Sequence, residues 1–190
     1  MPRSETETRN AVVTLHVVAS LDGFIARHDN SVSWLDSPAD AYEAGAPESA
    51  TGEGMGAIDC FVLGSHTYEH ALQLGWPYGD IPVIVATTRK LRSARQSVEF
   101  YSGDLRNLVN GMLAPRYRNI WLVGGAALCQ NFLSLGLVDE IRLMIAPVLL
   151  GDGLRLFSSS GAESRWRLKS VVAYKTGFVE LSYSRISPGS

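Results

Sequence analysis

The residues best suited to chemistry in this chain are small or hydroxylated side chains placed where apolar runs end. A glycine pair, Gly124 and Gly125, follows an apolar run at residues 119–123 and comes directly before a helical pattern. Glycine allows a sharp bend and close approach of a ligand, and free N–H groups at the start of the following helix attract an anion. The pair indicates a phosphate-binding turn, with a simple tight turn as the alternative.

A second apolar run, at residues 57–63, ends in the same way. It stops at Gly64 and Ser65, before an amphipathic helical pattern at residues 65–74. Thr67 then lies in the first turn of this expected helix. Its hydroxyl group adds a donor that suits a phosphate oxygen.

A third run, at residues 81–86, is followed by Thr87, Thr88 and Arg89. Open α/β sheets bind ligands at the carboxyl edge of their parallel strands, and Arg89 could make a bidentate, charge-assisted contact there. Three strand ends with such residues favour a phosphorylated cofactor over three accidental turns.

Composition narrows the class of protein. The chain has 190 residues, 46% of them hydrophobic, and a formal net charge of -2, which allows a sizeable core and argues against nucleic acid or an anionic membrane as partner. No apolar stretch is long enough to span a bilayer, and the polar N-terminus does not resemble a secretory signal, so a cytoplasmic address is expected. Cys60 and Cys129 are expected to be buried, reduced thiols.

The order of the patterns predicts the fold class. Strand-length runs alternate with helical patterns to about residue 135, which is typical of a mostly parallel sheet covered by helices on both faces. Residues 165–174 and 177–186 then form an expected antiparallel pair, so the sheet is mixed. We expect a disordered tail at residues 1–10, a single domain at residues 11–187, and a long mobile loop at residues 45–56.

An ordered series of motifs resembles the dihydrofolate reductase-like superfamily, in particular the reductase domain of the riboflavin-pathway bifunctional deaminase-reductase. The series comprises residues 19–26, 63–67, 87–89, 122–126, 138–141 and 147–153. The resemblance implies a three-layer fold with a central mixed sheet, NADPH as hydride donor, a flat nitrogen heterocycle as substrate and a homodimer.

Residue by residue, the resemblance implies three groups of site positions. The cofactor group comprises Trp34, Gly64, Ser65, Thr67, Thr87, Thr88, Arg89, Val123, Gly124, Gly125, Ala126 and Ala127. The substrate group comprises Ser20, Asp22 and Ile25, although an Asp-Gly turn is the plain alternative for Asp22. The candidate acids that would engage the substrate ring are Asp40 and Asp36, each of which could instead cap a helix that starts at Pro38.

Two departures from the family pattern affect specificity. Ser65 stands where dihydrofolate reductases usually have an arginine, so a preference for NADPH over NADH would depend largely on Arg89. Val123 stands where riboflavin-pathway reductases commonly have a substrate-binding glutamate.

Neither His-x-Glu nor Pro-Cys-x-x-Cys occurs, which excludes zinc-dependent deamination on this chain. His66 and His70 share a helical spacing, but no third ligand is evident, so no metal site is expected.

The sequence therefore predicts an NADPH-dependent oxidoreductase that acts on a pyrimidine or pteridine-type compound. The leading example is 5-amino-6-(5-phosphoribosylamino)uracil reductase of riboflavin biosynthesis. Reduction of dihydrofolate is one alternative. The other is a protein that binds NADPH without catalysis.

Overall fold

The computed structural model describes residues 10–36, 44–46, 57–157 and 163–186. Residues 1–9 of the expected tail at residues 1–10, Asp40 and most of the expected loop at residues 45–56 lie outside the described residues. The elements, in chain order, are β1 (Val12–Ser20), β2 (Phe24–Ala26), η1 (Ser33–Asp36), β3 (Cys60–Gly64), α1 (Ser65–Gln73), β4 (Val83–Ala86), β5 (Val98–Tyr101), α2 (Leu105–Asn107), η3 (Leu108–Leu113), β6 (Asn119–Gly124), α3 (Ala126–Ser134), β7 (Glu140–Ala146), β8 (Leu154–Arg155), β9 (Trp166–Ala173) and β10 (Val179–Arg185).

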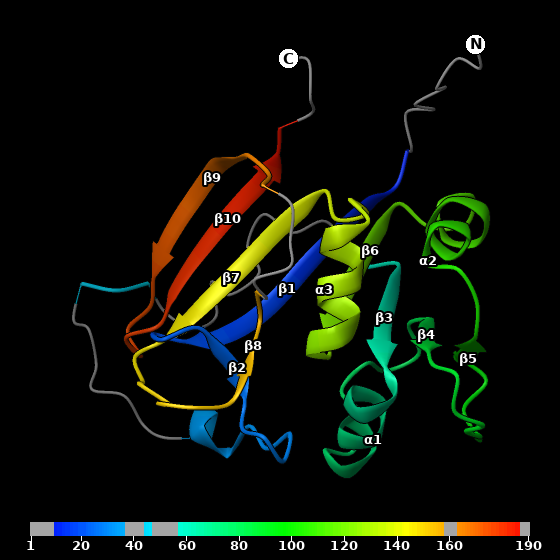
Figure 1. Cartoon of the computed structure of the whole chain (residues 1–190), viewed down its shortest axis with the longest axis horizontal. Coiled ribbons are helices and arrows are strands. Elements are labelled where there is room, and N and C mark those ends of the chain that lie inside the picture. The colour runs from blue at the N-terminus through cyan, green and yellow to red at the C-terminus, as the bar shows by residue number, and fades with distance from the viewer. Residues whose placement is uncertain (1–9, 37–43, 47–56, 158–162, 187–190) are drawn as a thin grey trace.

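Eight strands form one twisted sheet in the order β5-β4-β3-β6-β1-β7-β10-β9 (Figure 1). β1 pairs in parallel with β6 and β7, β3 with β4 and β6, and β4 with β5. β10 is antiparallel to both β7 and β9. The predicted mixed, mostly parallel sheet with an antiparallel C-terminal pair is confirmed.

The parallel strands alternate their side chains between two apolar cores. Cys60, Val62 and Ile120 belong to a core that also contains Cys129 and Phe132 of α3. Phe61 and Leu63 belong to a second core, which contains Tyr68 and Ala71 of α1. Because successive residues of a strand point to opposite faces, α1 and α3 must cover opposite faces of the sheet.

This arrangement creates a crevice between β3 and β6. The two strands are parallel neighbours, and each leads directly into a helix on a different face. Ligands of open α/β sheets bind at such a position, outside the carboxyl ends of the strands. The fold thus brings the end of β3 and the end of β6 together, although Gly64 and Gly124 are 60 positions apart in the sequence.

A small second sheet, formed by β2 and β8, lies beside the main one. It joins the segment after β1 to the segment after β7. None of the helices in the described part of the chain has the length and apolar character needed to cross a membrane.

Candidate functional site

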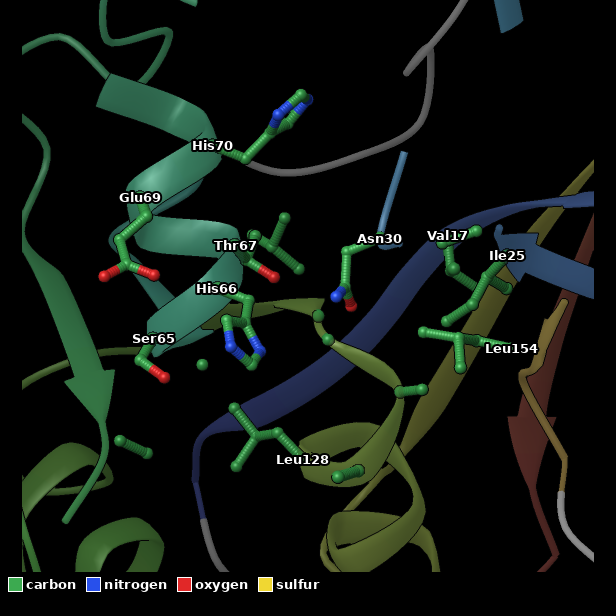
Figure 2. Close-up of a pocket in the computed structure, with 18 of the residues that line it drawn as sticks. Val17, Ile25, Asn30, Ser65, His66, Thr67, Glu69, His70, Leu128 and Leu154 are labelled. Atoms are coloured by element: carbon green, nitrogen blue, oxygen red, sulfur yellow. The ribbon is translucent and has the colours of Figure 1, made fainter. Parts of the chain in front are cut away.

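A cleft of about 1560 Å³ opens along the carboxyl edge of the parallel strands. Its lining includes the residues that directly follow β3, β4, β5 and β6, and part of the segment after β2. Figure 2 shows α1 on one side of this cleft and Val17, Ile25 and Leu154 on the other. The cleft therefore has a polar side and an apolar side.

The polar side is built from the first turns of α1 and α3. Neither helix has a side-chain cap: the N-cap residues are Gly64 and Gly125. A Cβ added at Gly64 would lie 3.4 Å from the backbone nitrogen of Gly125, and one added at Gly125 would lie 3.6 Å from Thr67 Oγ1. Two uncapped helix N-termini therefore meet beside one threonine hydroxyl, an arrangement suited to an anion.

The turn between β6 and α3 has an unusual backbone. The peptide bond between Gly124 and Gly125 is cis, and Gly124 has a φ of +151°. Side chains other than glycine rarely adopt that φ, which explains why glycine occupies the position. Val123, Ala126 and Ala127 line the cleft around this turn.

The strand end at β4 contributes hydroxyl groups to the cleft through Thr87 and Thr88. Arg89 does not line the cleft. Its guanidinium makes a bidentate pair with Glu69 of α1, with Nη1 2.9 Å from Oε2 and Nη2 2.6 Å from Oε1. Hydrogen bonding from Arg89 lowers the pKa of Glu69, which itself lines the cleft.

The three positions assigned to the substrate are in different environments. Ile25 lines the cleft, but Ser20 and Asp22 hold a turn. The Asp22 carboxylate accepts hydrogen bonds from Ser20 Oγ at 2.5 Å, from the Leu150 amide at 3.0 Å and from the Gly151 amide at 2.7 Å. These hydrogen bonds lower the pKa of Asp22 to about 2, and the bond from Ser20 has the largest effect.

The remaining predicted positions fall in or after η1. Trp34 is buried, its indole Nε1 has no hydrogen-bond partner among the residues that the structure describes, and its neighbours Ser33 and Leu35 line the cleft. Asp36 ends η1, but its side chain, like Asp40 as a whole, lies outside the described residues. The two candidate acids therefore stay predictions.

Sequence reasoning missed His16 of β1 and Trp121 of β6, which both line the cleft. Their rings are stacked, with centroids 4.5 Å apart and an interplanar angle of 13°. Burial, together with the positive charge of Arg142, lowers the pKa of His16 to about 4. A histidine inside an apolar strand was the available signal, but contact with Trp121 depends on strand order.

Metal-binding side chains do not gather in this site. Within the described ranges, no three residues of the His, Cys, Asp and Glu types lie together as a metal site would require. Cys60 and Cys129 are buried, as the sequence predicted, and burial raises the pKa of each thiol to about 12.

Comparison with known proteins places this architecture in a family. The sequence profile of the RibD C-terminal domain matches residues 61–179. The chain belongs to the RibD C-terminal domain family. The uncharacterized protein YwjB of Bacillus subtilis (strain 168) is 32% identical to this member over 173 residues, which cover 90% of this chain and 96% of YwjB.

Solved structures show the same fold at lower identity. A Shewanella sp. PV-4 protein provisionally named for riboflavin biosynthesis superposes with a TM-score of 0.78 at 23% identity, covering 93% of this chain and 99% of that one. Dihydrofolate reductase from Enterococcus faecalis, complexed with NADP(H), gives a TM-score of 0.65 at 14% identity, covering 94% and 98%. The RibD C-terminal domain fold of this chain is thus dihydrofolate reductase-like, as predicted.

Proposed function

We propose that this protein is an NADPH-dependent reductase of a pyrimidine or pteridine-type heterocycle. The observation that carries the proposal is the meeting of two uncapped helix N-termini at the glycine pair. A dinucleotide pyrophosphate fits such a cradle, because its charge is stabilised by backbone N–H groups and its bulk requires the absence of side chains. Membership of the RibD C-terminal domain family supports a reductase of this type.

Different residues of the cleft would bind the cofactor and orient the reacting rings. Thr67 and the first turns of α1 and α3 would bind the cofactor phosphates, and Thr87 and Thr88 would bind near the adenosine end. When bound, NADPH supplies the hydride. The protein's contribution is then to orient two flat rings and to exclude water at the apolar wall of Val17, Ile25 and Leu154.

The substrate we favour is 5-amino-6-(5-phosphoribosylamino)uracil or a close relative. Val123 lines the cleft where the resembling reductases commonly carry a glutamate, so this chain lacks one polar contact to that substrate. A related neutral heterocycle would not require the glutamate carboxylate that Val123 replaces. Dihydrofolate belongs in the same assay because it also has a flat, reducible ring.

The test is a spectrophotometric assay of NADPH oxidation with 5-amino-6-(5-phosphoribosylamino)uracil and with dihydrofolate, each against a no-substrate control. Substrate-dependent oxidation by the purified protein, reduced in Gly125→Ala at NADPH concentrations that do not saturate the variant, supports the reductase. Tight NADPH binding without oxidation of the cofactor by either compound would favour the non-catalytic alternative.

A further inference from the structure

The stacked pair formed by His16 and Trp121 has polar atoms without partners. His16 Nδ1 and Trp121 Nε1 are both buried, and neither makes a hydrogen bond among the described residues. Both residues line the cleft, although neither belongs to the phosphate cradle. Buried polar groups in proteins are normally paired, so two unpaired groups in adjacent side chains of a cleft point to a ligand.

The pair is held firmly by its neighbours across the sheet. Phe61 of β3 packs against Trp121 with a centroid distance of 5.5 Å. On the other side of His16, strand pairing places Arg142 of β7 next to it. Arg142 is itself paired with Glu180 at 3.3 Å, within a buried group. The rings therefore have little freedom to turn away from the cleft and find partners elsewhere.

Charge defines what the pair can recognise. Burial and the adjacent Arg142 keep His16 neutral near pH 7, because they lower its pKa to about 4. A neutral imidazole offers one donor and one acceptor, and the indole of Trp121 offers one donor. A neutral amide edge, with a carbonyl oxygen beside a ring N–H, complements this set. A carboxylate or a phosphate fits this set less well, because it would accept from the two donors and leave the imidazole acceptor without a partner.

We infer that His16 and Trp121 form the hydrogen-bonding subsite for the amide edge of the substrate's heterocycle. The inference rests on the proposed function and extends it, because it selects neutral rings that carry a lactam, such as uracil and pterin. His16 acts here as a recognition residue. The nicotinamide carboxamide of the cofactor has similar chemistry, so the experiment must distinguish the two sources.

The experiment follows the indole N–H signals of the four tryptophans by ¹H–¹⁵N NMR, with Trp121 assigned from Trp121→Phe. NADP⁺ is added first, and uracil or pterin is then titrated at saturating NADP⁺. We expect the Trp121 signal to move downfield on addition of uracil or pterin. A shift with NADP⁺ alone and none with the rings would assign the pair to the cofactor and overturn the inference.

Affinity measurements complete the test. His16→Leu should weaken binding of the responding ring by about fivefold to tenfold, the effect of losing one hydrogen bond, while His16→Asn should restore part of it. His28→Leu, at an exposed position outside the cleft lining, is the matched control. Equal ring affinity in His16→Leu and wild type, with melting temperatures unchanged, would contradict the inference.

Calorimetry with NADP⁺ keeps this result separate from the proposed function. If NADP⁺ does not bind but the ring still moves the Trp121 signal, the reductase proposal fails and the subsite stands. If NADP⁺ binds and the Trp121 signal is insensitive to both rings, the subsite fails and the reductase stands.

Discussion

Arg89 is the residue on which cofactor preference depends in our account, and Glu69 holds its guanidinium in a bidentate pair. A 2′-phosphate would have to replace that carboxylate, which lines the cleft. We predict that Arg89→Ala weakens NADPH binding about 10- to 100-fold, the effect of a charge-assisted contact, and leaves NADH binding unchanged. Calorimetric titration measures both affinities.

Glu69→Gln provides the matched variant for this prediction. It removes the competing charge and keeps the size of the side chain, so NADPH should bind several-fold more tightly than to wild type. Weaker NADPH binding in Glu69→Gln would show that the Glu69 carboxylate helps to bind the cofactor or to position Arg89, contrary to this prediction.

The lowered pKa of His16 leads to a prediction about how stability depends on pH. Its pKa is lowered from an ordinary 6.5 to about 4 in the folded state, so between these values the unfolded chain binds more protons. Stability is therefore lost as pH falls from about 6.5 to about 4, by an amount on the order of 3 kcal/mol. Urea unfolding across this range should show a shallower pH dependence in His16→Leu; parallel curves for the two proteins would contradict it.

At the scale of elements, the site is a junction of two strand-to-helix turns. Gly125→Ala should leave the fold intact, because its φ of -80° is ordinary and the new Cβ would be 3.6 Å from Thr67 Oγ1. The methyl group would, however, occupy the space between the two helix N-termini. We predict at least tenfold weaker NADPH binding with a melting temperature close to wild type, measured by calorimetry and thermal denaturation.

The control for Gly125→Ala is Ser134→Ala, at the other end of α3. This variant should bind NADPH as wild type does. If Gly125→Ala binds NADPH with unchanged affinity, the cofactor phosphates do not lie between α1 and α3.

Asp22 joins two connections of the fold, the turn after β1 and the segment after β7. Its pKa of about 2 is below the ordinary 3.8, so its contribution to stability is present above pH 4 and is lost as pH falls towards 2. Asp22→Asn should melt at a lower temperature at pH 7 and lose less stability on acidification than wild type. The exposed Asp80→Asn is the control, and equal acid sensitivity of Asp22→Asn and wild type would contradict this role.

The strands and helices on either side of the two glycine turns were predictable because each signal is local, whereas β5, α2 and η3 were not predicted. The apolar runs that end at Gly64 and Gly124 and the helical periods that follow them contain enough information within ten or so residues. The contacts of Asp22 with Leu150 and Gly151 span 128 and 129 residues, and the contact of His16 with Trp121 requires the order of β1 and β6. No local sequence pattern predicts long-range pairing of this kind.

At the scale of the whole molecule, β9 forms one edge of the sheet. Its Leu168 and Val171 are 52% and 55% exposed, which is unusual for large apolar side chains on an edge strand. We propose that a second copy of the chain covers them, in keeping with the predicted homodimer. Leu168→Lys combined with Val171→Lys should then lower the mass measured by light scattering from dimer to monomer, whereas a monomeric wild type would contradict the proposal.

Our proposal that the cleft between α1 and α3 binds a phosphorylated nicotinamide cofactor can be tested by one titration. The wild-type protein and Gly125→Ala are each titrated calorimetrically with NADPH and with NADH. We expect saturable one-site binding of NADPH to wild type, weaker binding of NADH, and loss of NADPH affinity in the variant. Absence of binding by either nucleotide to a folded wild-type protein would contradict it.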